Sequence, residues 1–424
     1  MVRVAVVGCA HGMLDDIYAT VDFVNEMDPE NPVELLLCCG DFECMRNIRD
    51  LETLACPPKY RALHAFHRYY KQEKTAPVLT IFVGGNHEAS GYLKELHYGG
   101  WVAPNMFYLG AAGVVNVAGL RIAGLSGIYK QQHYTAGRFE SMPFDNNTMR
   151  SVYHVRELEV FQLSHVQQID KTPLGVFLSH DWPEESSTLD KCLPRREFMQ
   201  ILDLPTSTAA NTPGSQKNDS DAPMSETKHD ATHSDDAAKT EASAQHAKRS
   251  PPKIMFDLEW LAILRATHHL ASSSKFAPRV PQEEMKIEDK DIAWVKQRLQ
   301  EFVVGKKIDK AEGEWITDFV KTAPGHGEEA GPVLVTGNPQ TDLLLELLKL
   351  PHVVTAPFVG GDATAANVDD PNEIDLDDDD GDENDVEDTK PMDTDAATSN
   401  DTNANPVVES TAAPADPCEI DLDL

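Results

Sequence analysis

Long apolar runs are absent from this 424-residue sequence, and no stretch approaches the ~20 residues that a membrane-spanning helix needs. The sequence also lacks the features of a disulfide framework. Its seven cysteines are scattered and odd in number, and we recognise no signal peptide. We therefore expect no membrane segment and no disulfide framework. A reducing compartment suits such a chain best.

Large apolar side chains are missing from one long segment and sparse in another. Residues 205–252 contain no Ile, Leu, Val, Phe, Trp or Tyr and are rich in Ala, Ser, Thr and Asp. Residues 359–424 are an acidic low-complexity tail with 22 Asp or Glu residues and one Lys. Neither segment can bury enough surface to fold, so we expect a disordered linker and a disordered tail.

Negative charge is distributed unevenly along the chain. The formal net charge is −33, and the tail accounts for −21 of it. The net charge of the whole chain therefore does not indicate whether its folded part meets nucleic acid. Hydrophobic residues make up 41% of the sequence, which is enough for a real core, and the length allows two or three domains.

Strand and helix patterns alternate along the first 204 residues. Short apolar runs predict strands, and apolar residues at helical spacing predict helices between them. This alternation favours an α/β sandwich. The predicted strands are residues 2–7, 33–39, 78–83, 107–109, 114–117, 120–125 and 174–178; the predicted helices are residues 14–27, a region around residues 60–70, and residues 149–168; residues 129–147 are predicted to be a long polar loop.

Residues able to bind a metal or carry a proton follow four of these strands. They are Cys9 and His11 after the first strand, Asp41 after the second, Asn86 and His87 after the third, and His180 after the last. Each one alone is more often structural than functional, but four such strand ends in sequence order form a pattern. Because ligands bind beyond the carboxyl ends of the strands in open α/β sheets, we expect these side chains to meet at one edge of one sheet.

The order of these motifs resembles that of the calcineurin-like metallophosphoesterases, which have Asp-x-His, Gly-Asp, Gly-Asn-His, a later His and Gly-His-x-His. Cys9 replaces the first aspartate, and a soft thiolate there alters which metal the first site prefers. With its surroundings, the chain is similar to the RNA lariat debranching enzyme family. The stretches that carry this resemblance are residues 4–12, 35–42, 57–61, 84–90, 98–105, 126–130, 150–156, 178–183, 189–196, 258–267 and 338–341.

The resemblance implies a metallophosphoesterase-type α/β/β/α sandwich over residues 1–204 and a smaller C-terminal domain over residues 253–350. It further implies a nuclear hydrolase that cuts the 2′,5′-phosphodiester at the branch point of excised intron lariat RNA. One or two divalent ions, Fe²⁺, Zn²⁺ or Mn²⁺, are expected with it. The implied metal ligands are Cys9, His11, Asp41, Asn86 and His180, with Asp41 bridging two ions, and the implied proton donor is His87.

Residues 127–156 correspond, by the same likeness, to a loop that recognises the lariat. The residue types suit that task independently, because cations meet phosphates and aromatic faces stack on the bases of single-stranded RNA. An ordinary polar surface loop is the alternative. The candidate RNA-binding residues are Tyr129, Lys130, His133, Tyr134, Arg138 and Phe139.

The last metal motif of the family is missing, because no His-x-His occurs anywhere in the sequence. Only six residues separate Pro183 from Asp190, so we expect an internal deletion near residues 184–189. Neither His326 nor the pair at residues 268–269 resembles a replacement. Two functions stay open: a debranching enzyme, or a catalytically impaired RNA-binding or scaffold form. A phosphoesterase for another phosphodiester fits less well with Cys9, and the oligomeric state is open.

Overall fold

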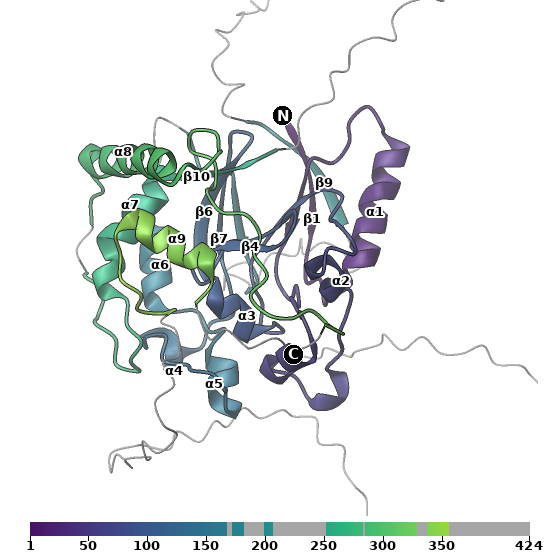
Figure 1. Ribbon diagram of the computed structural model, residues 1–424, viewed down its shortest axis with the longest axis horizontal. Coiled ribbons are helices and arrows are strands. Elements are labelled where there is room, and N and C mark those ends of the chain that lie inside the picture. Colours follow the sequence, from purple (N-terminus) through teal and green to yellow (C-terminus); the bar gives the residue numbers. More distant parts are fainter. Residues whose placement is uncertain (168–171, 182–198, 207–251, 283–284, 329–336, 356–424) are drawn as a thin grey trace, which may run out of the picture. The chain divides into compact units, whose positions relative to one another are not determined.

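The computed structural model describes residues 1–167, 172–181, 199–206, 252–282, 285–328 and 337–355 (Figure 1). All of these residues belong to one compact unit, residues 1–361. The expected deletion near residues 184–189, the expected tail at 359–424 and nearly all of the expected linker at 205–252 lie outside the described residues. Among the described helices, none combines the length and apolarity needed to cross a bilayer.

The first sheet of the described structure has six strands in the order β4-β5-β3-β2-β1-β9. Neighbours among β1, β2, β3 and β5 pair in parallel, and β4 and β9 pair antiparallel at the two edges. Parallel strands of this kind are buried on both faces, which explains their continuous apolar runs. The bounds are β1 Val2–Val7, β2 Leu35–Cys38, β3 Leu79–Phe82, β4 Gly100–Ala103, β5 Met106–Tyr108 and β9 Met199–Leu204.

The second sheet has four described strands in the order β10-β6-β7-β8. Strands β6 and β7 form a hairpin, β8 pairs in parallel with β7, and β10 from the C-terminal part of the chain pairs with β6. The expectation that all four ligand-bearing strands share one sheet is therefore wrong, because β8 belongs to the second sheet. The bounds are β6 Ala112–Val117, β7 Leu120–Leu125, β8 Val176–Ser179 and β10 Ile254–Phe256.

Two apolar clusters follow from the alternation of side chains along the strands. Val4 and Leu37 join a cluster with β6, β7 and the C-terminal helices, whereas Ala5 and Leu36 join a cluster with α1, α2 and α3. The layers are therefore helix, sheet, sheet and helix, which confirms the expected α/β/β/α sandwich. The helices are α1 Leu14–Met27, α2 Phe66–Tyr70, α3 Ser90–Glu95, α4 Gln131–Tyr134, α5 Asn146–Ser151, α6 Glu157–Ser164, α7 Leu258–Thr267, α8 Asp289–Lys306 and α9 Pro339–Leu348, with short 3₁₀ turns η1 Ile48–Thr53, η2 Pro58–Tyr60 and η5 His268–Leu270.

The predicted helix at residues 14–27 and the seven predicted strands are confirmed, with strand ends that differ from the prediction by at most two residues. The single helix predicted over residues 149–168 is wrong. It divides into α5 and α6, because Arg156 takes an extended conformation and its buried guanidinium bonds to the carbonyls of Ser151 and His154. The predicted loop at 129–147 likewise contains the short helix α4.

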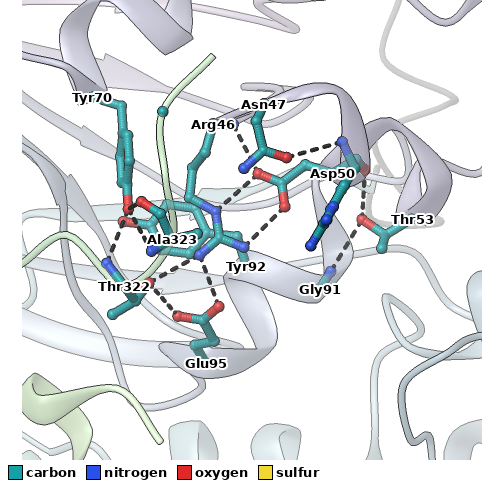
Figure 2. A network of polar contacts seen from close by, with 12 residues as sticks. Arg46, Asn47, Asp50, Thr53, Tyr70, Gly91, Tyr92, Glu95, Thr322 and Ala323 are labelled. Atoms are coloured by element: carbon teal, nitrogen blue, oxygen red, sulfur yellow. Dashed lines mark hydrogen bonds and ion pairs between the residues drawn. The ribbon is translucent and has the colours of Figure 1, made fainter. Parts of the chain in front are cut away.

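Arg46 fixes a C-terminal segment to the loop that follows β2 (Figure 2). Its guanidinium donates to both oxygens of Asp50, to Glu95 on α3 and to the hydroxyl of Thr322, at 2.8–2.9 Å. The ring of Tyr92 lies 4.0 Å below the guanidinium carbon. Arg46 and Asp50 are both buried, so each charge depends on the other for stabilisation.

We expect the substitution Arg46→Leu to lower the free energy of unfolding by about 3–5 kcal/mol, because Asp50 would stay buried without its partner. Urea unfolding measures the loss. The control is Arg49→Leu, which changes an exposed arginine of η1 and should alter stability by no more than about 0.5 kcal/mol. Similar losses for the two variants would contradict the prediction.

Candidate metal centre

Four strand ends bring polar side chains together in the described structure. Cys9 follows β1, Asp41 follows β2 and His180 follows β8, and their candidate ligand atoms all lie within 4.8 Å of one another. Asp41 belongs to a second group of the same kind with His11 and His87. The two groups meet at one carboxylate, so Asp41 lies at the centre of the cluster.

His180 connects the second sheet to the residues of the first. Its Nε2 lies 3.0 Å from Asn86 Oδ1 and 3.5 Å from Asp41 Oδ1. Its Nδ1 lies 3.0 Å from the carbonyl oxygen of Cys39 and 3.9 Å from Cys9 Sγ. One imidazole therefore contacts the strand ends of β1, β2 and β3 together.

The two oxygens of the Asp41 carboxylate face different histidines. Oδ1 accepts the backbone N–H of His87 at 2.9 Å and faces His180. Oδ2 lies 3.7 Å from His11 Nε2, and the rings of His11 and His87 are 5.8 Å apart. Asp41 is almost fully buried, so its position is fixed by the protein rather than by solvent.

The backbone at this cluster is strained where the ligands sit. His11 has φ +42° and Asp41 has φ +46°, in the left-handed region that side chains rarely adopt. Gly85 lets Asp41 and His180 lie directly against its backbone, because a Cβ at this position would collide with Asp41 Oδ1 and lie 2.8 Å from His180 Cε1. Such strain persists only where the surrounding contacts hold it.

The carboxylate of Glu88 makes several of the contacts that stabilise this strained backbone. It accepts the backbone N–H groups of Phe42 and Glu43 at 2.8 Å and of Gly85 at 3.0 Å. The loops after β2 and β3 are thereby joined through one buried side chain. Burial, and after it the charge of Asp41, raises the pKa of Glu88 to about 8.

The proton affinities of the cluster reflect its close contacts. Contact with Cys9, and then with Glu43, raises the pKa of His11 to about 10. Contact with His11, and then with His180, lowers the pKa of the Cys9 thiol to about 7. Burial opposes charge on His180, but Cys9 and Asp41 raise its pKa to about 9. The Cys9 thiol and the Asp41 carboxylate thus favour positive charge on the neighbouring imidazoles, and the same negative groups would favour a bound cation.

The donor set fits a divalent transition metal. A thiolate, imidazoles, a carboxylate and the amide oxygen of Asn86 converge, and these are ligands of Zn²⁺, Fe²⁺ and Mn²⁺ in proteins. Asp41 presents one oxygen to each of the two groups, which suits a carboxylate shared between two ions. When bound, such ions polarise a phosphate and lower the pKa of a water molecule.

Sequence reasoning missed three residues at this cluster: Glu43, His64 and Glu88. Glu88 directly follows the Gly-Asn-His motif, and that position was a signal that it serves the same loop. Glu43 lies two residues after Asp41, yet its distance from His11 depends on a left-handed turn. His64 carries no local signal, because it reaches Glu43 from the segment before α2.

The candidate recognition loop presents only some of its expected residues to solvent. Tyr129 is 55% exposed, and its ring lies 5.4 Å from that of Tyr134. His133 stacks on His154 with 4.9 Å between ring centroids, and the ring of Phe139 lies 6.3 Å from that of His133. Lys130 is half-buried at the start of α4.

Arg138 does not face solvent, contrary to the expectation of a phosphate-binding cation. Its side chain is buried and donates to Glu159 at 3.0 Å and to the carbonyl of Val152 at 2.9 Å. Arg138 therefore stabilises the loop from inside. Composition alone does not show which cation of a polar loop points inward.

The other histidines considered from the sequence lie elsewhere. His326 packs against His67 with 5.4 Å between ring centroids, and His268 Nε2 lies 2.9 Å from the carbonyl oxygen of Pro351. Neither belongs to the two groups around Asp41 in the described residues.

Comparisons with known proteins point to one family. The model of the calcineurin-like phosphoesterases matches residues 2–199, and that of the lariat debranching enzyme C-terminal domain matches residues 187–353. Lariat debranching enzyme of Arabidopsis thaliana is 34% identical over 392 residues, which cover 85% of this chain and 90% of the plant protein. The mouse enzyme is 42% identical over 300 residues, covering 63% of this chain and 54% of its own. This chain thus spans about half the length of its mouse relative.

We expect Gly85→Ala to weaken Mn²⁺ binding about 10-fold or more, because the new Cβ must displace Asp41 or His180. Titration with Mn²⁺ measures the change. Gly305→Ala is the control, since no atom of the described residues lies within 4 Å of a Cβ at this exposed position of α8. Gly305→Ala should bind Mn²⁺ with the affinity of the parent chain. The same unchanged affinity in Gly85→Ala would contradict the prediction that a Cβ at residue 85 disturbs Asp41 or His180.

Proposed function

This chain belongs to the lariat debranching enzyme family of the calcineurin-like phosphoesterases, and we propose that it hydrolyses the 2′,5′-phosphodiester at the branch point of excised intron lariat RNA. The observation that carries the proposal is the convergence of Cys9, His180, His11 and His87 on Asp41. The product is a linear intron ready for turnover. Such a substrate implies residence in the nucleus.

Each side chain has a proposed task in this reaction. Cys9, His11, Asp41, Asn86 and His180 hold one or two divalent ions, Fe²⁺, Zn²⁺ or Mn²⁺. Asp41 serves both groups because its oxygens face opposite sides of the cluster. His87 shares the second group but is proposed to hold a proton for the leaving 2′-oxygen, since its backbone N–H already fixes Asp41 and its ring faces His11.

The polypeptide is proposed to divide this work between two regions. Residues 1–204 form the catalytic domain, and residues 253–350 form the C-terminal domain. The second region contributes β10 to the second sheet and α7, α8 and α9 to the core beside it. Substrate binding falls to residues 127–156, where Tyr129, Lys130, His133, Tyr134 and Phe139 are the proposed RNA contacts.

A second function is favoured by the absence of His-x-His from all 424 residues. A chain without those ligands would bind branched RNA yet cleave it weakly or not at all. Two-metal hydrolysis needs both ions held in place, and losing even an outer partner of a metal ligand costs ~10–100-fold. The two functions therefore differ in rate rather than in substrate.

We expect this chain to cleave branched 2′,5′-linked RNA far more slowly than a variant with a His-x-His segment inserted between Pro183 and Asp190. Cleavage is measured with Mn²⁺, Fe²⁺ or Zn²⁺ on a short branched RNA. His87→Gln in the inserted variant is the negative control and should lose about 10²–10⁴-fold in kcat. Equal rates for the chain with and without the insertion would show that other residues complete the site.

We expect Tyr129→Ala to weaken binding of branched RNA about 5- to 150-fold, because stacking of a base on an aromatic ring contributes about 1–3 kcal/mol. Fluorescence anisotropy in EDTA measures binding without cleavage. Phe23→Ala removes a similarly exposed ring, 61% accessible on α1, and should bind RNA unchanged. Matching affinities for both variants would refute a role for the loop in stacking.

A further inference from the structure

The carboxylate of Glu43 lies between two imidazoles beside the candidate metal centre. Its Oε1 is 3.8 Å from His11 Nδ1, and its Oε2 is 3.4 Å from His64 Nε2. We propose that Glu43 is a positioning residue that fixes the orientation of His11 for metal binding, and that His64 holds Glu43 in place. The inference rests on the proposed metal-dependent function and concerns only how one of the proposed ligands, His11, is oriented.

The two nitrogens of His11 face different carboxylates, and this division is the core of the argument. Nδ1 faces Glu43, whereas Nε2 faces Asp41 Oδ2 at 3.7 Å. An N–H at Nδ1 directed to Glu43 leaves the Nε2 lone pair on the side of Asp41, the shared candidate ligand. A carboxylate that receives the other N–H of a ligating histidine fixes its tautomer and ring orientation.

Glu43 is held too firmly to be an incidental neighbour. It is 6% exposed, so its carboxylate needs partners inside the protein. Its backbone takes φ +57° and donates its N–H to Glu88 Oε2 at 2.8 Å, while its carbonyl accepts the N–H of Met45 at 2.7 Å. The same Glu88 carboxylate binds the residue after Asp41, so Asp41 and Glu43 keep one relative position.

His64 reaches Glu43 from a separate segment and also touches the loop that carries His11. A Cβ placed on Gly12 would lie 2.6 Å from His64 Cβ, so the glycine, at φ +67°, lets the two segments pack directly. Contact with His64 occupies Glu43 Oε2 and leaves Oε1 directed to His11. Three loops therefore define the position of one metal-facing imidazole.

The test is the Mn²⁺ affinity of the full chain, read by electron paramagnetic resonance of free Mn²⁺. Glu43→Gln keeps the size of the side chain and should raise the Kd about 10- to 100-fold. Glu52→Gln removes the same charge from an exposed position of η1 and should leave the Kd unchanged. Equal Kd values for the two variants would overturn the proposal, as would a parent chain that binds no Mn²⁺.

Double substitution tests the part assigned to His64. Because His64 acts through Glu43, His64→Gln should raise the Kd in the parent but have no further effect in Glu43→Gln. If the double variant instead raised the Kd by the product of the two single effects, His64 would act independently of Glu43 and the assignment would be overturned. Selective ¹⁵N-histidine NMR of the Zn²⁺-loaded parent gives a readout free of mutation: His11 should keep its proton at Nδ1, and a proton at Nε2 would refute the proposed orientation.

RNA cleavage distinguishes this inference from the proposed function. A chain that binds Mn²⁺ with a Glu43-dependent Kd but leaves branched RNA intact would support the positioning role and reject the debranching activity. A chain that cleaves branched RNA, but whose Kd for Mn²⁺ does not change in Glu43→Gln, would support the debranching activity and reject the positioning role of Glu43.

Discussion

The contact on which the site depends is the buried carboxylate of Glu88 accepting three backbone N–H groups. Two of them belong to Phe42 and Glu43 after β2, and one belongs to Gly85 after β3. These three amides stabilise the Glu88 carboxylate, which joins the loops after β2 and β3. The backbone N–H of His87, donated to Asp41, joins the same two loops a second time. The left-handed turns at Asp41 and Glu43 flank the same anchor, so their strain is held where the ligands are needed.

The loop after β2 is held from its outer side as well. Arg46 follows Glu43 by three residues, and its carbonyl accepts the N–H of His326 while its guanidinium bonds Thr322. The C-terminal segment thus braces the loop that begins at Asp41, as Figure 2 shows for the Arg46 network. Residues more than 270 positions apart in sequence therefore support one carboxylate, and the C-terminal region is part of the structural support of the site.

Local sequence patterns predicted seven of the described strands and the helix α1, but not β4, β9 or β10, and not how the strands divide between the two sheets. The run that became β8 reads like the runs of β1 and β2, because a short apolar strand carries no information about which sheet it joins. Arg138 was expected to meet phosphate for a related reason: composition marks a polar loop without showing that its guanidinium bonds Glu159 inside. Glu43 and His64 were missed because their proximity depends on a strained turn and on packing at Gly12, neither of which has a sequence period.

His180 follows a strand of the second sheet, whereas the other candidate ligands follow strands of the first. The geometry of the site therefore depends on how the two sheets pack against each other in the core. Gly124 on β7 lies against Val83 at the end of β3, where a Cβ would come within 2.5 Å of the valine methyl. Gly124 also pairs with Leu178, two residues before His180, and Val83 lies three residues before Asn86. The two sheets are therefore tightly packed at Gly124, within a few residues of the 3.0 Å contact between His180 and Asn86. Because cores are close-packed, a change of one methyl group between the sheets is transmitted to the ligands rather than absorbed.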